Sequence, residues 1–182
     1  MMRRIAGPFL YLALIFIAFS ASGAAQTVPK PEEVLGFKVG EDYHLATYSQ
    51  AIAYFKKLAE NSDRIKLFDL GKTTLGQTMT YAVISMPENL AQLDKFKGIS
   101  RQLSLAQGLS DEEAVKLSGE GKAIVYIDGG LHASECAPAQ HNIQLAYDLA
   151  SATDPKTLRI LNDVILILVF ANPDGMNLLA EW

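Results

Sequence analysis

Residues 123–135 constrain the fold more than any other stretch of this sequence. Residues 123–127 (AIVYI) are apolar and rich in β-branched side chains, a pattern that predicts a buried central strand. The strand is expected to end at Gly129 and Gly130, because glycine lets the backbone turn sharply without the steric cost of a Cβ atom. A helical pattern begins soon afterwards. These residues therefore predict a buried strand followed by a strand-to-helix turn.

The predicted turn carries an imidazole and a carboxylate, His132 and Glu135. A strand-to-helix turn can aim both side chains at a single point, which would supply two of the three protein ligands of a typical catalytic zinc site. Ligands also collect at the carboxyl ends of strands in open α/β sheets, and the pair lies at such an end. The alternative is that the spacing arises by chance and that Glu135 only favours the positive end of a helix.

Two motifs in this order resemble those of a known family. The motif GLHASE at residues 130–135 is followed by NPDG at residues 172–175, as in the zinc carboxypeptidases of the funnelin type. The similarity covers residues 35–182 and looks like the N-terminal half of a secreted bacterial branch. It implies zinc as the cofactor, His132 and Glu135 as metal ligands, and a peptide as the substrate.

The resemblance also implies residues that we do not find in this sequence. Family members complete the zinc site with a later His, hold the substrate carboxylate with Arg and Asn-Arg positions, and use a Glu as general base. In the family these positions follow the NPDG motif, which we interpret as a turn with a scaffold role. His44 has no spacing relation to the pair, and His141 is expected to point away from Glu135 on a helix. We therefore predict no catalytic residue before Trp182 and interpret the chain as an incomplete N-terminal piece.

A loop before the pair departs from the family pattern. The family commonly has Glu-Gly-Arg where this chain has Leu75-Gly76-Gln77, which removes a charge but changes no zinc ligand.

The leading functional prediction is a zinc-dependent metallocarboxypeptidase, which hydrolyses C-terminal peptide bonds. A related zinc deacylase or amidase acting on small amides is one alternative, because the same His-x-x-Glu start serves both enzymes. A non-catalytic exported protein that binds peptides or glycans on the same scaffold is the other. Losing the third ligand and the base would produce such a protein.

Composition and charge limit the kind of domain and the binding partners that we expect. The chain has 182 residues, 49% of them apolar, which is sufficient for a globular domain with a proper core. Its net charge of −4 gives no basic footprint for nucleic acid. Cys136 is the only cysteine, so no intrachain disulfide can form.

Residues 1–25 have the pattern of a secretory signal peptide. Arg3 and Arg4 precede an apolar core at residues 9–19, and small residues at 20–25 suit cleavage. The core is shorter than the roughly 20 residues of a membrane span. An uncleaved anchor is the alternative, since no charge interrupts residues 5–28. We expect a secreted or periplasmic protein with no stable membrane association after signal removal.

The remaining chain is predicted to form one α/β unit. Residues 26–40 are expected to be an extended lead-in, and residues 41–182 the N-terminal part of a zinc carboxypeptidase-like domain. Residues 65–70 and 78–85 have the pattern of an antiparallel hairpin, and residues 164–170 that of a strand covered on both faces. The predicted fold class is a mixed sheet with helices on both faces, incomplete at its C-terminal end.

Overall fold

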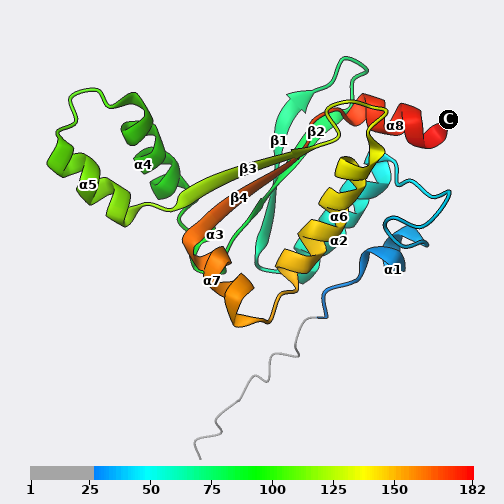
Figure 1. The fold of residues 1–182 in the computed structure, drawn as a ribbon, viewed down its shortest axis with the longest axis horizontal. Helices are drawn as coiled ribbons and strands as arrows, with labels where there is room; N and C mark the ends of the chain where they lie inside the picture. The colour runs from blue at the N-terminus through cyan, green and yellow to red at the C-terminus, as the bar shows by residue number, and fades with distance from the viewer. Residues whose placement is uncertain (1–26) are drawn as a thin grey trace, which may run out of the picture.

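The computed structural model describes residues 27–182, so the predicted signal peptide lies outside the described residues. The described chain forms a mixed α/β structure (Figure 1). Its elements follow in the order α1 (Pro31–Leu35), α2 (Tyr48–Asn61), β1 (Ile65–Lys72), β2 (Thr78–Ile84), α3 (Pro87–Leu90), α4 (Leu93–Leu105), α5 (Asp111–Glu120), β3 (Ala123–Gly129), α6 (Cys136–Ala150), α7 (Pro155–Asp163), β4 (Val164–Phe170) and α8 (Pro173–Glu181). None of the described helices is long and apolar enough to cross a membrane.

The four strands form one sheet in the order β1-β2-β4-β3. β1 and β2 make the predicted antiparallel hairpin, and β2 also pairs antiparallel with β4. β4 and β3 are parallel, and α6 and α7 form the connection between them. The predicted mixed sheet is therefore confirmed.

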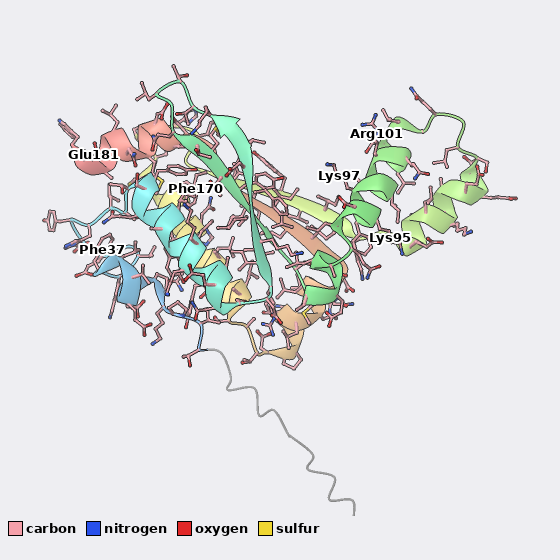
Figure 2. All side chains as sticks on the ribbon, turned by 180° about the vertical axis from the view of Figure 1, so that it is seen from behind. Phe37, Lys95, Lys97, Arg101, Phe170 and Glu181 are labelled. Carbon is pink, nitrogen blue, oxygen red and sulfur yellow. The ribbon has the colours of Figure 1, made fainter. Side chains whose placement is uncertain are left out.

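The main core lies between the sheet and helices α2 and α6, which run side by side over one face (Figure 1). Helix α2 begins directly after its N-cap, Thr47, whose side chain accepts a hydrogen bond from the backbone N–H of Gln50. Phe170, at the end of β4, packs beneath it with its ring centroid 5.2 Å from that of Phe55 and 5.7 Å from that of Tyr48 (Figure 2). This packing holds the end of β4 against the helices.

The second face of the sheet is covered less completely. A smaller core there includes Val83 and Ile165 from the strands and Phe96 and Ile99 from α4. Together with Leu168 and Phe170 on the first face, Ile165 gives β4 apolar contacts on both faces, as predicted. α4 and α5 project beyond the end of the sheet (Figure 1), and α5 contains no buried residue.

The prediction that residues 123–127 form a buried central strand is wrong in its burial and its place. Those residues do form a strand, β3, but it lies at the edge of the sheet and pairs within the described chain only with β4. Ile124, Val125 and Tyr126 are 41%, 38% and 59% exposed. Only the carboxyl end of the strand, at Gly129, is buried, and this is the end that leads into the predicted turn.

The predicted extended lead-in is interrupted by the short helix α1. Pro31 occupies its first turn, where the missing proline N–H costs nothing. The Glu33 carboxylate accepts from the backbone N–H of Lys30 at 3.1 Å, and Gly36 ends the helix in the left-handed conformation with φ of 84°. Local capping therefore folds a segment whose prolines alone suggested an extended chain.

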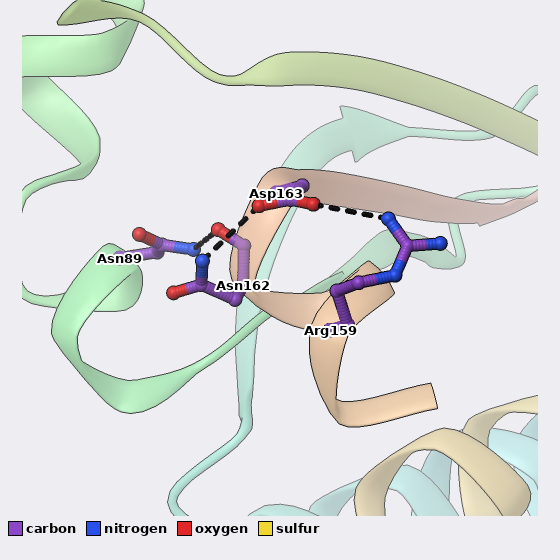
Figure 3. Close-up of polar contacts among 4 residues, drawn as sticks. All are labelled: Asn89, Arg159, Asn162 and Asp163. Atoms are coloured by element: carbon purple, nitrogen blue, oxygen red, sulfur yellow. Dashed lines mark hydrogen bonds and ion pairs between the residues drawn. The ribbon is translucent and has the colours of Figure 1, made fainter. Parts of the chain in front are cut away.

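A buried amide fixes where α7 ends and β4 begins. Asn89 donates through Nδ2 to the carbonyl of Asn162 at 2.8 Å (Figure 3). The same group also donates to Ser85 Oγ at 2.9 Å. On the exposed side of the same helix end, Arg159 pairs with Asp163 at 3.4 Å. These contacts anchor the start of the strand whose far end leads to residues 172–175.

Candidate metal centre

The Gly-Gly turn places the candidate ligands directly after β3. Gly130 has φ of 76°, and a Cβ atom there would lie 2.8 Å from Cβ of Ala139 on α6. The residue must therefore be glycine for both conformational and steric reasons. Beyond it, the backbone N–H of Glu135 donates to the carbonyl of His132 at 3.0 Å. That bond closes a turn and brings the side chains of His132 and Glu135 to the same side.

The two predicted ligands converge at the carboxyl end of β3. His132 Nδ1 lies 3.1 Å from Glu135 Oε2, and the side chains are 67% and 62% exposed. Two atoms at this separation can each lie about 2.1 Å from one common point, the usual zinc-to-ligand distance for nitrogen and oxygen. The donor set fits as well, since an imidazole nitrogen and a carboxylate oxygen are both common zinc ligands. The pair therefore fits two positions of a zinc site.

The other two histidines lie elsewhere. His141 is exposed on α6 and lines a groove together with His44, whereas His132 and Glu135 line a smaller neighbouring pocket. His44 Nδ1 lies 2.9 Å from the carbonyl oxygen of Asp42, and its ring is tilted by 30° against that of Phe37, with the centroids 5.1 Å apart. No group of three or more metal-binding side chains occurs in residues 27–182, and residues 1–26 contain no His, Cys, Asp or Glu.

Residues 172–175 begin a helix, which corrects the interpretation of NPDG as a turn and nothing more. Asn172 is the N-cap of α8, and its Oδ1 accepts from the backbone N–H of Gly175 at 2.8 Å. Pro173 occupies the first helical turn. The same residues favour turns and helix starts, so Asn followed by Pro was the signal for an N-cap at this position.

Asp174 ties the start of α8 to the hairpin loop between β1 and β2. Its carboxylate accepts from the backbone N–H of Leu75 at 3.1 Å and from Gln77 Nε2 at 2.7 Å. Desolvation acts to raise the pKa of Asp174, but hydrogen bonds from Gln77, Thr73 and Leu75 outweigh it and lower that pKa below its usual range. The departure from Glu-Gly-Arg thus lies in a loop that contacts the NPDG motif, a role that the sequence alone did not reveal.

Comparison with known proteins decides the family. A sequence model described as zinc carboxypeptidase matches residues 51–182, which is most of the chain. The chain belongs to the zinc carboxypeptidase family. The resemblance carried by GLHASE and NPDG is therefore confirmed. A search of curated protein sequences gives no match.

Solved structures share the fold of this zinc carboxypeptidase chain at low sequence identity. Thrombin activatable fibrinolysis inhibitor matches with a TM-score of 0.55 and 10% identity over 82% of this chain. Carboxypeptidase A from Helicoverpa armigera matches with a TM-score of 0.51 and 18% identity over 80% of this chain. A metallo-carboxypeptidase from Burkholderia cenocepacia matches with a TM-score of 0.51 and 21% identity over 74% of this chain. The match spans 31%, 31% and 29% of those chains, respectively, so this chain corresponds to about a third of their length.

Proposed function

We propose that this chain supplies two zinc ligands, His132 and Glu135, to a zinc carboxypeptidase that hydrolyses C-terminal peptide bonds. The observation that carries the proposal is the 3.1 Å approach of His132 Nδ1 to Glu135 Oε2 in a chain of this family. Their place at the carboxyl end of a strand of an α/β sheet, where ligands commonly bind, supports it further.

The residues of this chain would hold the metal at an accessible surface. Both side chains are more than half exposed, so a peptide can approach them from solvent. A zinc ion bound there would polarise the scissile carbonyl and lower the pKa of its bound water. The glycine-dependent turn and the hydrogen bond from Glu135 N–H to the His132 carbonyl keep the two ligands together.

Zinc affinity tests the ligand assignment directly. In a competition with a chromophoric chelator, we expect His132→Ala and Glu135→Ala each to weaken zinc binding by at least about tenfold. His141→Ala is the matched control, because His141 is exposed on α6 and lies outside the pocket that the pair lines. Equal affinity of the unsubstituted chain and His132→Ala would overturn the assignment.

We also propose that the chain is exported through cleavage of residues 1–25. The motivation is the order of Arg3-Arg4, the apolar core and the small residues before the cleavage point. N-terminal sequencing of protein recovered outside the cytoplasm should begin near Ala25 or Gln26. An intact Met1 end on soluble cytoplasmic protein would contradict export.

A further inference from the structure

Two residues that follow β4 form hydrogen bonds with the loop that carries the candidate ligands. The backbone N–H of Ala171 donates to the carbonyl of Gly129 at 3.0 Å. One residue later, Asn172 donates through Nδ2 to the carbonyl of Leu131 at 3.3 Å. The carbonyl of Leu131 belongs to the peptide group that joins Leu131 to His132, so this bond acts on the backbone from which the His132 side chain projects.

The first turn of α8 packs against the same loop without room for a side chain. A Cβ atom on Gly175 would lie 2.8 Å from Cβ of Ala133 and 2.5 Å from Nδ2 of Asn172. Met176 and Leu179 of α8 also line the small pocket that contains His132 and Glu135. The ligand loop is therefore held from one side by the start of α8, with Asn172 at the point of polar contact.

We propose that Asn172 is a positioning residue for His132. Its Oδ1 caps α8, and its Nδ2 uses that anchored position to hold the peptide group before His132. This inference rests on the proposed zinc function. Groups that orient metal ligands without binding the metal typically contribute tenfold to a hundredfold to metal affinity. Asn172 should thus affect zinc binding although it is not a ligand.

Two substitutions separate this role from simple helix capping. Asn172→Ser keeps an oxygen that can cap α8 but loses the amide that reaches Leu131. Asn172→Asp also keeps a capping oxygen and lacks the donor, and its added negative charge would by itself favour zinc. A loss of affinity in Asn172→Asp therefore cannot come from electrostatics.

Gln77→Ala is the matched control. Gln77 also anchors α8 through a neutral amide, with Nε2 on Asp174 at 2.7 Å and Oε1 accepting from Asn177 at 2.9 Å. These contacts join α8 to the hairpin loop between β1 and β2 rather than to Leu131. If the Asn172 variants lose zinc affinity because α8 is loosened in general, Gln77→Ala should lose affinity as well. If they lose it because the Leu131 contact is missing, Gln77→Ala should keep its affinity.

The experiment measures zinc affinity by chelator competition, the visible absorption spectrum of bound Co²⁺, and the melting temperature of each variant. We expect Asn172→Ser and Asn172→Asp to weaken zinc binding about tenfold and to alter the Co²⁺ spectrum. Gln77→Ala should stay within about twofold of the unsubstituted chain, well below the effect of an outer-shell group.

Three results would decide against the inference. Unchanged zinc affinity in both Asn172 variants, with His132→Ala impaired, overturns the positioning role and leaves the ligand assignment intact. Equal losses in Gln77→Ala and Asn172→Ser show a purely structural effect. Equal affinity of the unsubstituted chain and His132→Ala overturns the proposed zinc function and this inference with it.

Discussion

At the scale of single residues, the candidate site depends on positions where a side chain is forbidden. Gly130 and Gly175 bring α6 and α8 against the loop of His132 and Glu135, and any Cβ atom would separate them. The two candidate ligands are exposed, but their loop packs closely against α6 at Gly130 and against α8 at Ala133. The candidate site therefore combines close packing at two glycines with accessible side chains.

Substituting Gly130 should show this constraint as a loss of stability. Gly130→Ala forces a non-glycine residue to φ of 76° and a Cβ contact of 2.8 Å with Ala139. We expect the free energy of unfolding in urea to fall by about 1–3 kcal/mol. Gly98→Ala in α4 is the control, since nothing lies within 4 Å of its Cβ position and alanine favours helices. A Gly130→Ala variant as stable as the parent would refute the close packing.

Asp174 should make part of the stability depend on pH. Its pKa is lower in the folded chain than in the unfolded chain, so its contribution is complete above the unfolded value, about 3.9, and is lost as pH falls through the folded value. We expect Asp174→Asn to be less stable than the parent at pH 7, and the difference to shrink in acid. Urea unfolding at pH 7 and at a series of lower pH values measures this. A difference that stays the same across the series would contradict the assigned hydrogen bonds.

At the scale of elements, β3 combines two opposite environments. Its carboxyl end is buried and leads into the ligand loop, whereas Ile124, Val125 and Tyr126 are exposed at the sheet edge. An apolar strand edge can pair with another chain, and natural proteins commonly protect such edges with charge or a covering segment. Within the described residues, the protection is absent along most of β3.

We therefore predict that the isolated chain self-associates through β3. Val125→Lys should reduce the association, because a lysine on an edge strand discourages pairing with another strand. Val115→Lys, on exposed α5, adds the same charge at a helical site that is 72% exposed and should have no effect. Analytical ultracentrifugation over a range of concentrations distinguishes the variants. Equal association of the two would show that the β3 edge is not the contact.

The contacts that could be predicted from the sequence are those between residues that lie close together in the chain. The caps at Thr47 and Ser110 were predictable because each bonds a residue only three positions away. Asn172 and Leu131 lie 41 positions apart, and Asp174 and Gln77 lie 97 apart. No local sequence pattern predicts either hydrogen bond. Burial of β3 was wrongly predicted for a similar reason, since an apolar run looks the same at an edge as in the interior.

At the scale of the whole molecule, the described chain brings both candidate ligands from a single loop. Catalytic zinc sites typically have three protein ligands, and His132 and Glu135 are candidates for two of them. The chain also spans only about a third of the length of the carboxypeptidases that share its fold. The chain thus carries two candidate zinc ligands on one loop of an α/β fold.

We predict that the 182-residue chain binds zinc weakly and releases no C-terminal amino acids from peptides. Weak binding should still raise the melting temperature as zinc is added, because a ligand of the folded state stabilises it by mass action. The shift should disappear in His132→Ala. A mixed peptide panel, assayed with and without a chelator, tests activity. Chelator-sensitive turnover at enzyme-like rates would show that the chain contains a further ligand and a base.

On the proposed role of Asn172, its hydrogen bond to the Leu131 carbonyl also sets the time at which the candidate zinc site can form. The hairpin of β1 and β2 closes a short loop and is expected to form early. The hydrogen bond between Asn172 and Leu131 joins residues 41 apart, with α6, α7 and β4 between them, and is expected to form later. A chain emerging from a ribosome would expose His132 and Glu135 well before Asn172 follows. Such a nascent chain would carry both candidate ligands but not yet the contact proposed to position His132, so we expect its zinc affinity to rise only after the start of α8 has emerged.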